Sequence, residues 1–236
     1  MRFNVYDVAW HEFATLKACA HAVSGAVAAQ LCDAIDARGR ASVALSGGST
    51  PRRMLSILAN AEVDWTKVTI MLVDERWCSH EDPSSNFRMI SEGLNLGRAG
   101  AATMIPMWHA EEEPDVAARR LSAMLDGHGP LDVVVLGMGT DAHTASWIPQ
   151  AHGLDRALSD DAPKICVVRP TDGRHVRLTM TRRAVCSART KLLHLHGRGK
   201  QDVLRHALAK QGGWHEFPVR AALSCGSTSI YVGEED

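Results

Sequence analysis

The chain has 236 residues, 45% of them apolar, and a formal net charge of −1. This length and composition are typical of a globular protein with a sizeable core, and they exclude a fibrous or disordered chain. The balanced charge favours neither a nucleic-acid partner nor a membrane surface, so an acidic ligand would need a local cluster of arginine and lysine.

Apolar spacing and end signals predict the elements in chain order. They are a helix over 12–37, a strand over 41–46, a helix over 52–61, a strand over 67–73, helices over 84–94 and 113–126, strands over 131–137, 164–170, 175–181 and 190–197, a helix over 201–211, and a last edge strand over 227–233. Gly39 and Gly127 are expected to follow helix ends, and Thr50 or Ser49 is expected to cap the second helix.

Strands that alternate with helices need crossover connections, which predicts an α/β fold with a mostly parallel β-sheet covered by helices on both faces. Because no linker, repeat or low-complexity tract divides the chain, we predict one domain over residues 1–236. Ligands of such sheets bind beyond the carboxyl ends of the strands. Three segments that follow predicted strands are therefore the places to look for a site: 46–51, 74–76 and 137–146.

Residues 46–51 read SGGSTP, between a predicted strand and a predicted helix. Gly47 and Gly48 permit positive φ and a close approach of the backbone, while Ser49 and Thr50 add hydroxyl groups. Free N–H groups at such a turn favour a phosphate. An ordinary strand-to-helix turn has the same local features, so the motif alone leaves both interpretations open.

Charged residues follow the second predicted strand as Asp74, Glu75 and Arg76. Their place at the carboxyl edge favours a ligand site, and a guanidinium such as that of Arg76 can hold an anionic oxygen through two hydrogen bonds. Asn86, after an Asp-Pro turn, is expected to return a polar side chain to the same edge. A solvated surface triplet is the alternative interpretation.

The strand predicted over 131–137 runs into a glycine-rich turn, GMGTDAHTAS. Gly139 lies in this turn, His143 is a candidate general base near neutral pH, and Asp141 is a carboxylate that can orient it. A surface or capping histidine is the alternative interpretation. The turn also fits a loose dinucleotide fingerprint, but Pro149 breaks the helix that this motif requires.

Two further cations are candidates for the phosphate site: Arg177 in the RLTMT strand and Lys200 after HGRG. Each alone fits a solvated surface charge, but cations that converge on a dianion bind it strongly. The sequence contains neither HExxH nor GxSxG, so a zinc hydrolase and a nucleophile-elbow esterase have no local support.

The six cysteines are scattered, and none forms a CxxC motif or a Cys/His pair at zinc spacing. Their apolar neighbours favour buried free thiols in a reducing compartment. Asp7, His11 and Glu12 interrupt any apolar run at the start of the chain, which does not resemble a signal peptide. We therefore expect a cytoplasmic protein.

The motifs SGGSTP, VDER with DPSSNFRM, LGMGTDAHTASWIP, RLTMT and HGRGK occur in the order seen in 6-phosphogluconolactonases. The sequence resembles this family from about residue 40 to 205, and the wider superfamily includes glucosamine-6-phosphate deaminases. The resemblance implies a Rossmann-like parallel sheet, no metal or organic cofactor, and a sugar-phosphate lactone as partner. The implied reaction is hydrolysis of 6-phospho-D-glucono-1,5-lactone to 6-phosphogluconate in the oxidative pentose phosphate pathway.

Matched positions imply roles for individual residues. The resemblance implies a phosphate site made by Gly47, Gly48, Ser49, Thr50, Arg177 and Lys200. It implies that Arg76 faces the lactone and that His143 is the general base that activates water. Asp74, Asn86 and Gly139 are expected to line the same substrate site.

Two positions depart from the family pattern. Ala142 stands where the family usually has glycine, and Ser227 stands about where an acidic residue is expected. If the family turn needs positive φ at residue 142, a methyl group there puts the aim of His143 in question. A non-catalytic sugar-phosphate sensor and a deaminase-like enzyme therefore stay open as alternatives. The TASWIP segment lacks the Asn-Glu pair typical of the deaminases, and the oligomeric state stays open.

Overall fold

The computed structural model describes residues 6–209 and 212–234. The larger sheet consists of β1 (Val8–Phe13), β2 (Ala41–Leu45), β3 (Val68–Leu72), β5 (Thr103–Met104), β6 (Val133–Leu136), β9 (Thr190–His196) and β10 (Thr228–Gly233). Their order across the sheet is β1-β10-β9-β6-β2-β3-β5, and every pairing is parallel. The predicted α/β fold with a mostly parallel sheet is confirmed.

Three short strands form a second, antiparallel sheet: β4 (Asp74–Arg76), β7 (Ile165–Val168) and β8 (Arg177–Met180), in the order β4-β8-β7. The N–H of Met180 donates to the carbonyl of Val73, 2.8 Å away, just after β3. The small sheet therefore extends from the carboxyl edge of the large one, and it brings its own side chains to that edge.

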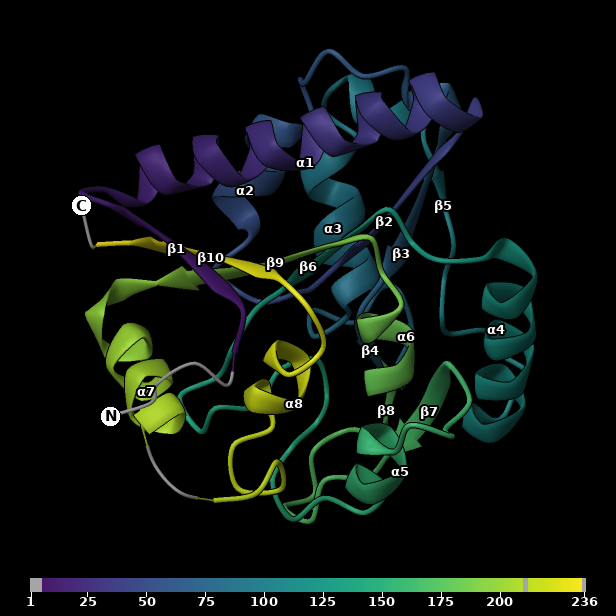
Figure 1. The fold of residues 1–236 in the computed structure, drawn as a ribbon. Helices are drawn as coiled ribbons and strands as arrows, with labels where there is room; N and C mark the ends of the chain where they lie inside the picture. The colour runs from purple at the N-terminus through teal and green to yellow at the C-terminus, as the bar shows by residue number, and fades with distance from the viewer. Residues whose placement is uncertain (1–5, 210–211, 235–236) are drawn as a thin grey trace.

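The helices are α1 (Leu16–Arg38), α2 (Arg52–Leu58), α3 (Asn86–Leu94), α4 (Pro114–His128), α5 (Leu154–Leu158), α6 (Arg182–Cys186), α7 (Gly197–Ala209) and α8 (Val219–Leu223), with 3₁₀ turns η1 (Trp65–Lys67) and η2 (Arg98–Ala101). Figure 1 shows α1, α2 and α3 on one side of the large sheet, and α7, α8 and the small sheet on the other. Both faces of the parallel strands are thus covered, as their uninterrupted apolar runs require.

The first helix is shorter than predicted. Residues 8–13 form β1, which pairs with β10, so the helix begins at Leu16 with Thr15 as its N-cap and ends before Gly39. The strand over 227–233 was expected at an edge, and this expectation is wrong because β1 covers it. By length and composition α1 could cross a membrane, but its buried side chains pack on the sheet and on α2.

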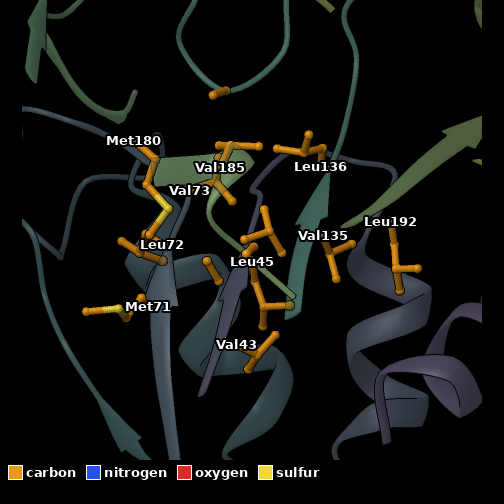
Figure 2. Close-up of a cluster of buried hydrophobic side chains, with 14 of the residues drawn as sticks. Val43, Leu45, Met71, Leu72, Val73, Val135, Leu136, Met180, Val185 and Leu192 are labelled. Atoms are coloured by element: carbon orange, nitrogen blue, oxygen red, sulfur yellow. The ribbon is translucent and has the colours of Figure 1, made fainter. Parts of the chain in front are cut away.

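The core joins the two sheets. In Figure 2, Leu45 of β2, Leu72 of β3 and Leu136 of β6 gather with Met180 of β8 and Val185 of α6. All five are fully buried, and each large aliphatic side chain contributes roughly 1.5–3 kcal/mol by burial. The strand ends that carry the candidate site are therefore fixed by packing.

Several local expectations need correction. Helix α4 continues through Gly127 to His128, and Gly129 ends it. Helix α7 begins at Gly197, four residues before its predicted start, and the predicted end at residue 211 lies outside the described residues.

The expectation of free thiols is wrong for one pair of cysteines. Cys186 and Cys225 form a disulfide, with their Cα atoms 5.4 Å apart. They lie 39 residues apart in the chain, so no local spacing motif could reveal the pair. Cys19 and Cys166 are buried free thiols, as expected.

Candidate active site

A cavity of about 220 Å³ opens at the carboxyl edge of the large sheet. It is lined by Ser46, Gly47, Gly48, Ser49, Thr50, Asp74, Arg76, Asn86, Gly137, Met138, Gly139, His143, Ala145, Arg177 and Lys200. These residues include every predicted site residue except Asp141, which contacts His143. The structure thus brings together the three segments that follow predicted strands.

The SGGSTP segment forms one wall of the cavity as a turn with free donors. Gly48 has φ of 102°, which only glycine adopts readily. Within the described part of the chain, the backbone N–H groups from Gly47 to Thr50 have no hydrogen-bond acceptor. Neither Thr50 nor Ser49 caps α2, contrary to expectation; Thr50 Oγ1 instead accepts a hydrogen bond from Lys200 Nζ at 3.1 Å.

Asn86 fits against this turn because Gly47 has no side chain. A Cβ at Gly47 would lie 1.9 Å from Asn86 Oδ1, so no larger residue is compatible with this packing. The amide of Asn86 also donates from Nδ2 to the carbonyl of Asp74 at 2.8 Å. One side chain therefore bridges the end of β4 and the SGGSTP turn.

Two arginines stand side by side in the cavity. Arg76 of β4 pairs directly with Arg177 of β8, and directly opposed residues of an antiparallel pair point to the same side. The Nε atoms of both guanidinium groups are buried without a hydrogen-bond partner. Burial lowers the pKa of Arg177, and Asp74, at 3.7 Å, opposes this effect. Such unpaired buried donors are typical of a site that binds an anion.

The carboxylate of Asp74 is held by Ser146, a residue of the 137–146 turn that was not among the predicted site residues. Ser146 Oγ donates to Asp74 Oδ2 at 2.5 Å, and the N–H of Ser146 donates to Thr179 Oγ1 at 3.2 Å. The hydroxyl and the N–H of Ser146 are shielded from bulk solvent, since Ser146 is fully buried. No sequence signal links Ser146 to Asp74, because the contact joins segments 72 residues apart.

His143 and Asp141 form a dyad at the cavity. His143 Nδ1 lies 2.5 Å from Asp141 Oδ1, and this hydrogen bond lowers the pKa of Asp141 to about 2. The carboxylate is therefore ionised near neutral pH and can only accept, so Nδ1 must carry the proton. The lone pair of the neutral ring then lies on Nε2, the atom that a general base needs.

The dyad depends on a glycine. A Cβ at Gly139 would lie 2.3 Å from His143 Cε1 and 2.6 Å from Asp141 Oδ1. The N–H of Gly139 also donates to the carbonyl of His143 at 2.9 Å, which closes the turn. Gly139 therefore permits the close packing of backbone against the imidazole ring.

The loop that carries His143 has an unusual backbone. Ala142, Ala145 and Gln150 have φ of 60°, 52° and 64°, a region that non-glycine residues rarely adopt. The carbonyl of Ala142 accepts a hydrogen bond from the N–H of Val219 at 3.0 Å, and Thr144 Oγ1 donates to Gly137 O at 2.7 Å. The alanine at 142 thus takes a glycine-like conformation, held by α8.

The charge of the cavity is positive although the chain as a whole is nearly neutral. Arg76, Arg177 and Lys200 line it together with a single carboxyl side chain, that of Asp74. Burial lowers the pKa of Lys200, as expected for a cation away from water. The cluster of arginine and lysine that an acidic ligand would need is present. Among the described residues, no three His, Cys, Asp or Glu side chains gather as a metal site.

Known proteins share this sequence and fold. The family model for glucosamine-6-phosphate isomerases/6-phosphogluconolactonase matches residues 14–231. The 6-phosphogluconolactonase of Rhizobium meliloti is 40% identical over 224 residues, which cover 94% of this chain and 96% of that protein. The one from Pseudomonas putida is 39% identical over 214 residues, covering 90% and 88%.

A solved structure agrees with these relatives. The crystal structure of a 6-phosphogluconolactonase from Shewanella baltica has a TM-score of 0.91 to this chain at 35% identity, covering 98% of this chain and 99% of that one. The resemblance drawn from the motifs is confirmed. The chain therefore belongs to the glucosamine-6-phosphate isomerase/6-phosphogluconolactonase family of enzymes.

Proposed function

We propose that this protein hydrolyses 6-phospho-D-glucono-1,5-lactone to 6-phosphogluconate in the oxidative pentose phosphate pathway. The observation that carries the proposal is that one cavity is lined by His143, which pairs with Asp141, by three cationic side chains and by the free N–H groups of the SGGSTP turn. Relatives named 6-phosphogluconolactonase, two of them 40% and 39% identical over 94% and 90% of this chain, support the same reaction.

The phosphate is proposed to bind at the SGGSTP turn. The free N–H groups of this turn and the ammonium of Lys200 lie on one wall of the cavity, next to Thr50. Arg177 adds a buried guanidinium with an unpaired Nε. A dianion would satisfy these donors together, and binding energy from this remote group would hold C1 of the lactone near the dyad.

His143 is proposed to act as the general base. Water attacks C1 while its proton passes to His143 Nε2, and Asp141 stabilises the imidazolium that forms. The C1–O5 bond then breaks, and the proton is transferred to O5 as the ring opens to the carboxylic acid. A lactone is an activated ester, so the reaction needs a base and no protein nucleophile.

Negative charge develops on the carbonyl oxygen of C1 during the attack. The unpaired Nε of Arg76 supports this side chain as the group that stabilises the charge. The expectation that Arg76 serves the lactone end and Arg177 the phosphate end stays a prediction, because the two side chains are neighbours in β4 and β8.

The structure weakens the reason for the sensor alternative. That alternative rested on the methyl group of Ala142, and Ala142 adopts the left-handed φ of 60° that the turn would need from glycine. The orientation of the His143 side chain is consistent with catalysis, since the ring contacts Asp141 and His143 lines the cavity. A cytoplasmic location, a single domain over 1–236 and the absence of a cofactor stay predictions.

The test is lactone loss in the purified protein, with the lactone generated in situ and the spontaneous rate subtracted. We expect an enzyme-dependent rate and no ammonia release from glucosamine 6-phosphate. No rate above background, combined with saturable binding of 6-phosphogluconate, would contradict the proposal and favour the sensor. Ammonia release would favour the deaminase-like alternative.

A further inference from the structure

Glu75 is a buried carboxylate next to the cavity that the proposed reaction does not use. Its side chain is on the opposite face of β4 from its neighbours Asp74 and Arg76, because side chains alternate along a strand. Glu75 is 1% exposed and does not line the cavity. A buried carboxylate is costly unless its oxygens accept hydrogen bonds, so the partners of Glu75 indicate what it does.

The carboxylate joins the end of β4 to the start of α3. Its Oε1 accepts hydrogen bonds from the N–H groups of Arg76 at 2.7 Å and Asn86 at 2.8 Å. Its Oε2 accepts from the N–H of Phe87 at 2.7 Å and from Ser85 Oγ at 3.0 Å. Two of the first N–H groups of the nine-residue α3 therefore donate to Glu75.

These bonds fix the residue that packs against the SGGSTP turn. Glu75 holds the N–H of Asn86, and the side chain of Asn86 occupies the space that Gly47 leaves open. The same carboxylate holds the N–H of Arg76, whose guanidinium lines the cavity. Two walls of the cavity are thus joined to one side chain that does not itself line the cavity.

We infer that Glu75 is a positioning residue that sets the phosphate-binding geometry through Asn86. This inference rests on the proposed function, because it assumes that the SGGSTP turn binds the phosphate. Burial raises the pKa of Glu75, and the four hydrogen bonds oppose this effect by stabilising the ionised form. A neutral amide could not accept from all four donors, because its NH₂ group would face N–H groups.

The test compares Glu75→Gln with a matched control, Asp132→Asn. Asp132 is 7% exposed and accepts hydrogen bonds from the N–H and hydroxyl of Ser42, but it directly precedes β6 at the amino edge of the large sheet and does not line the cavity. Titration calorimetry measures the Kd of 6-phosphogluconate and of inorganic phosphate, and denaturant unfolding measures stability. We expect both variants to lose stability, and only Glu75→Gln to raise both Kd values, by roughly tenfold.

Asn86→Ala tests the route of the effect. If Glu75 acts through Asn86, the double variant Glu75→Gln/Asn86→Ala should have about the same Kd as the single variant that binds more weakly. The effects of two residues that act through one contact do not add. If the two losses of binding free energy add, or if Asn86→Ala binds as the wild type does, Glu75 does not act through Asn86. If Glu75→Gln does not fold, Glu75→Asp decides: it keeps the charge but retracts the carboxylate, and should weaken phosphate binding severalfold.

The outcomes separate this inference from the proposed function. A wild-type protein that binds 6-phosphogluconate without turning over lactone would reject the reaction and leave the Kd comparison valid. A folded Glu75 variant with wild-type Kd, or an equal loss in Asp132→Asn, would overturn the inference alone. A wild-type protein that binds neither 6-phosphogluconate nor phosphate would overturn both.

Discussion

The substitution Gly139→Ala is the sharpest test of how the backbone shapes the dyad. The added Cβ would lie 2.3 Å from His143 Cε1, 2.4 Å from Nδ1 and 2.6 Å from Asp141 Oδ1, all closer than the 3.0 Å below which real Cβ contacts essentially do not occur. The ring must therefore leave its place or the turn must open. Either change breaks the hydrogen bond between His143 and Asp141.

The expected loss follows from what the base contributes. A general base accelerates such a step by roughly 10²–10⁴-fold, which corresponds to about 3–5 kcal/mol of transition-state stabilisation. A displacement of about 1 Å can already cost 10²-fold. We expect Gly139→Ala to lower kcat by at least 10²-fold, and to lower it little further when combined with His143→Ala.

The assay is lactone hydrolysis with the spontaneous rate subtracted. Gly127→Ala is the control, because a Cβ at Gly127 in α4 meets nothing within 4 Å. The control should keep the wild-type rate, and both variants should bind 6-phosphogluconate. A Gly139→Ala protein with wild-type kcat would refute the reasoning, because the dyad would then not depend on the space that glycine leaves.

Three other predictions concern the loop, the phosphate site and pH. Ala142→Gly should leave kcat within about threefold, because residue 142 already has a glycine-like φ; a large gain in turnover would show that alanine distorts the turn. Arg177→Ala should raise the Kd of 6-phosphogluconate at least roughly tenfold in calorimetry, and an unchanged Kd would remove Arg177 from the phosphate site. Burial lowers the pKa of His194 to about 4, so the unfolded chain binds one more proton between that value and the ordinary value of 6.5, and stability should fall as pH falls through this window. Between pH 7 and 4.5, the free energy of unfolding of the wild type should fall by roughly 2–3 kcal/mol more than that of His194→Gln, as measured by denaturant unfolding. Equal falls would contradict the burial of a neutral ring.

The sequence predicted the edge of the sheet where the site lies because the buried strands are plain apolar runs. Each of the segments 46–51, 74–76 and 137–146 follows such a run, and parallel strands bring their carboxyl ends together. The cavity is lined by residues of all three. The candidate residues could therefore be named before any contact between them was known.

Contacts between distant segments could not be predicted in this way. Strand β1 was missed because none of its six residues is fully buried, so it has no apolar run, and because its pairing with β10 joins segments near the two ends of the chain. The burial of Glu75 and its hydrogen bonds to the start of α3 were missed because a charged triplet at a strand end resembles solvated surface. The bond from Val219 to Ala142 and the disulfide likewise join segments with no shared local pattern.

The measurement that tests the central claim most directly compares the wild type with His143→Ala. Both proteins are given lactone generated in situ, and both are titrated with 6-phosphogluconate. The account predicts that His143→Ala loses roughly 10²–10⁴-fold in turnover while it folds and binds the product as the wild type does. Near-normal turnover by His143→Ala would contradict the account, because the water would then be activated by another group.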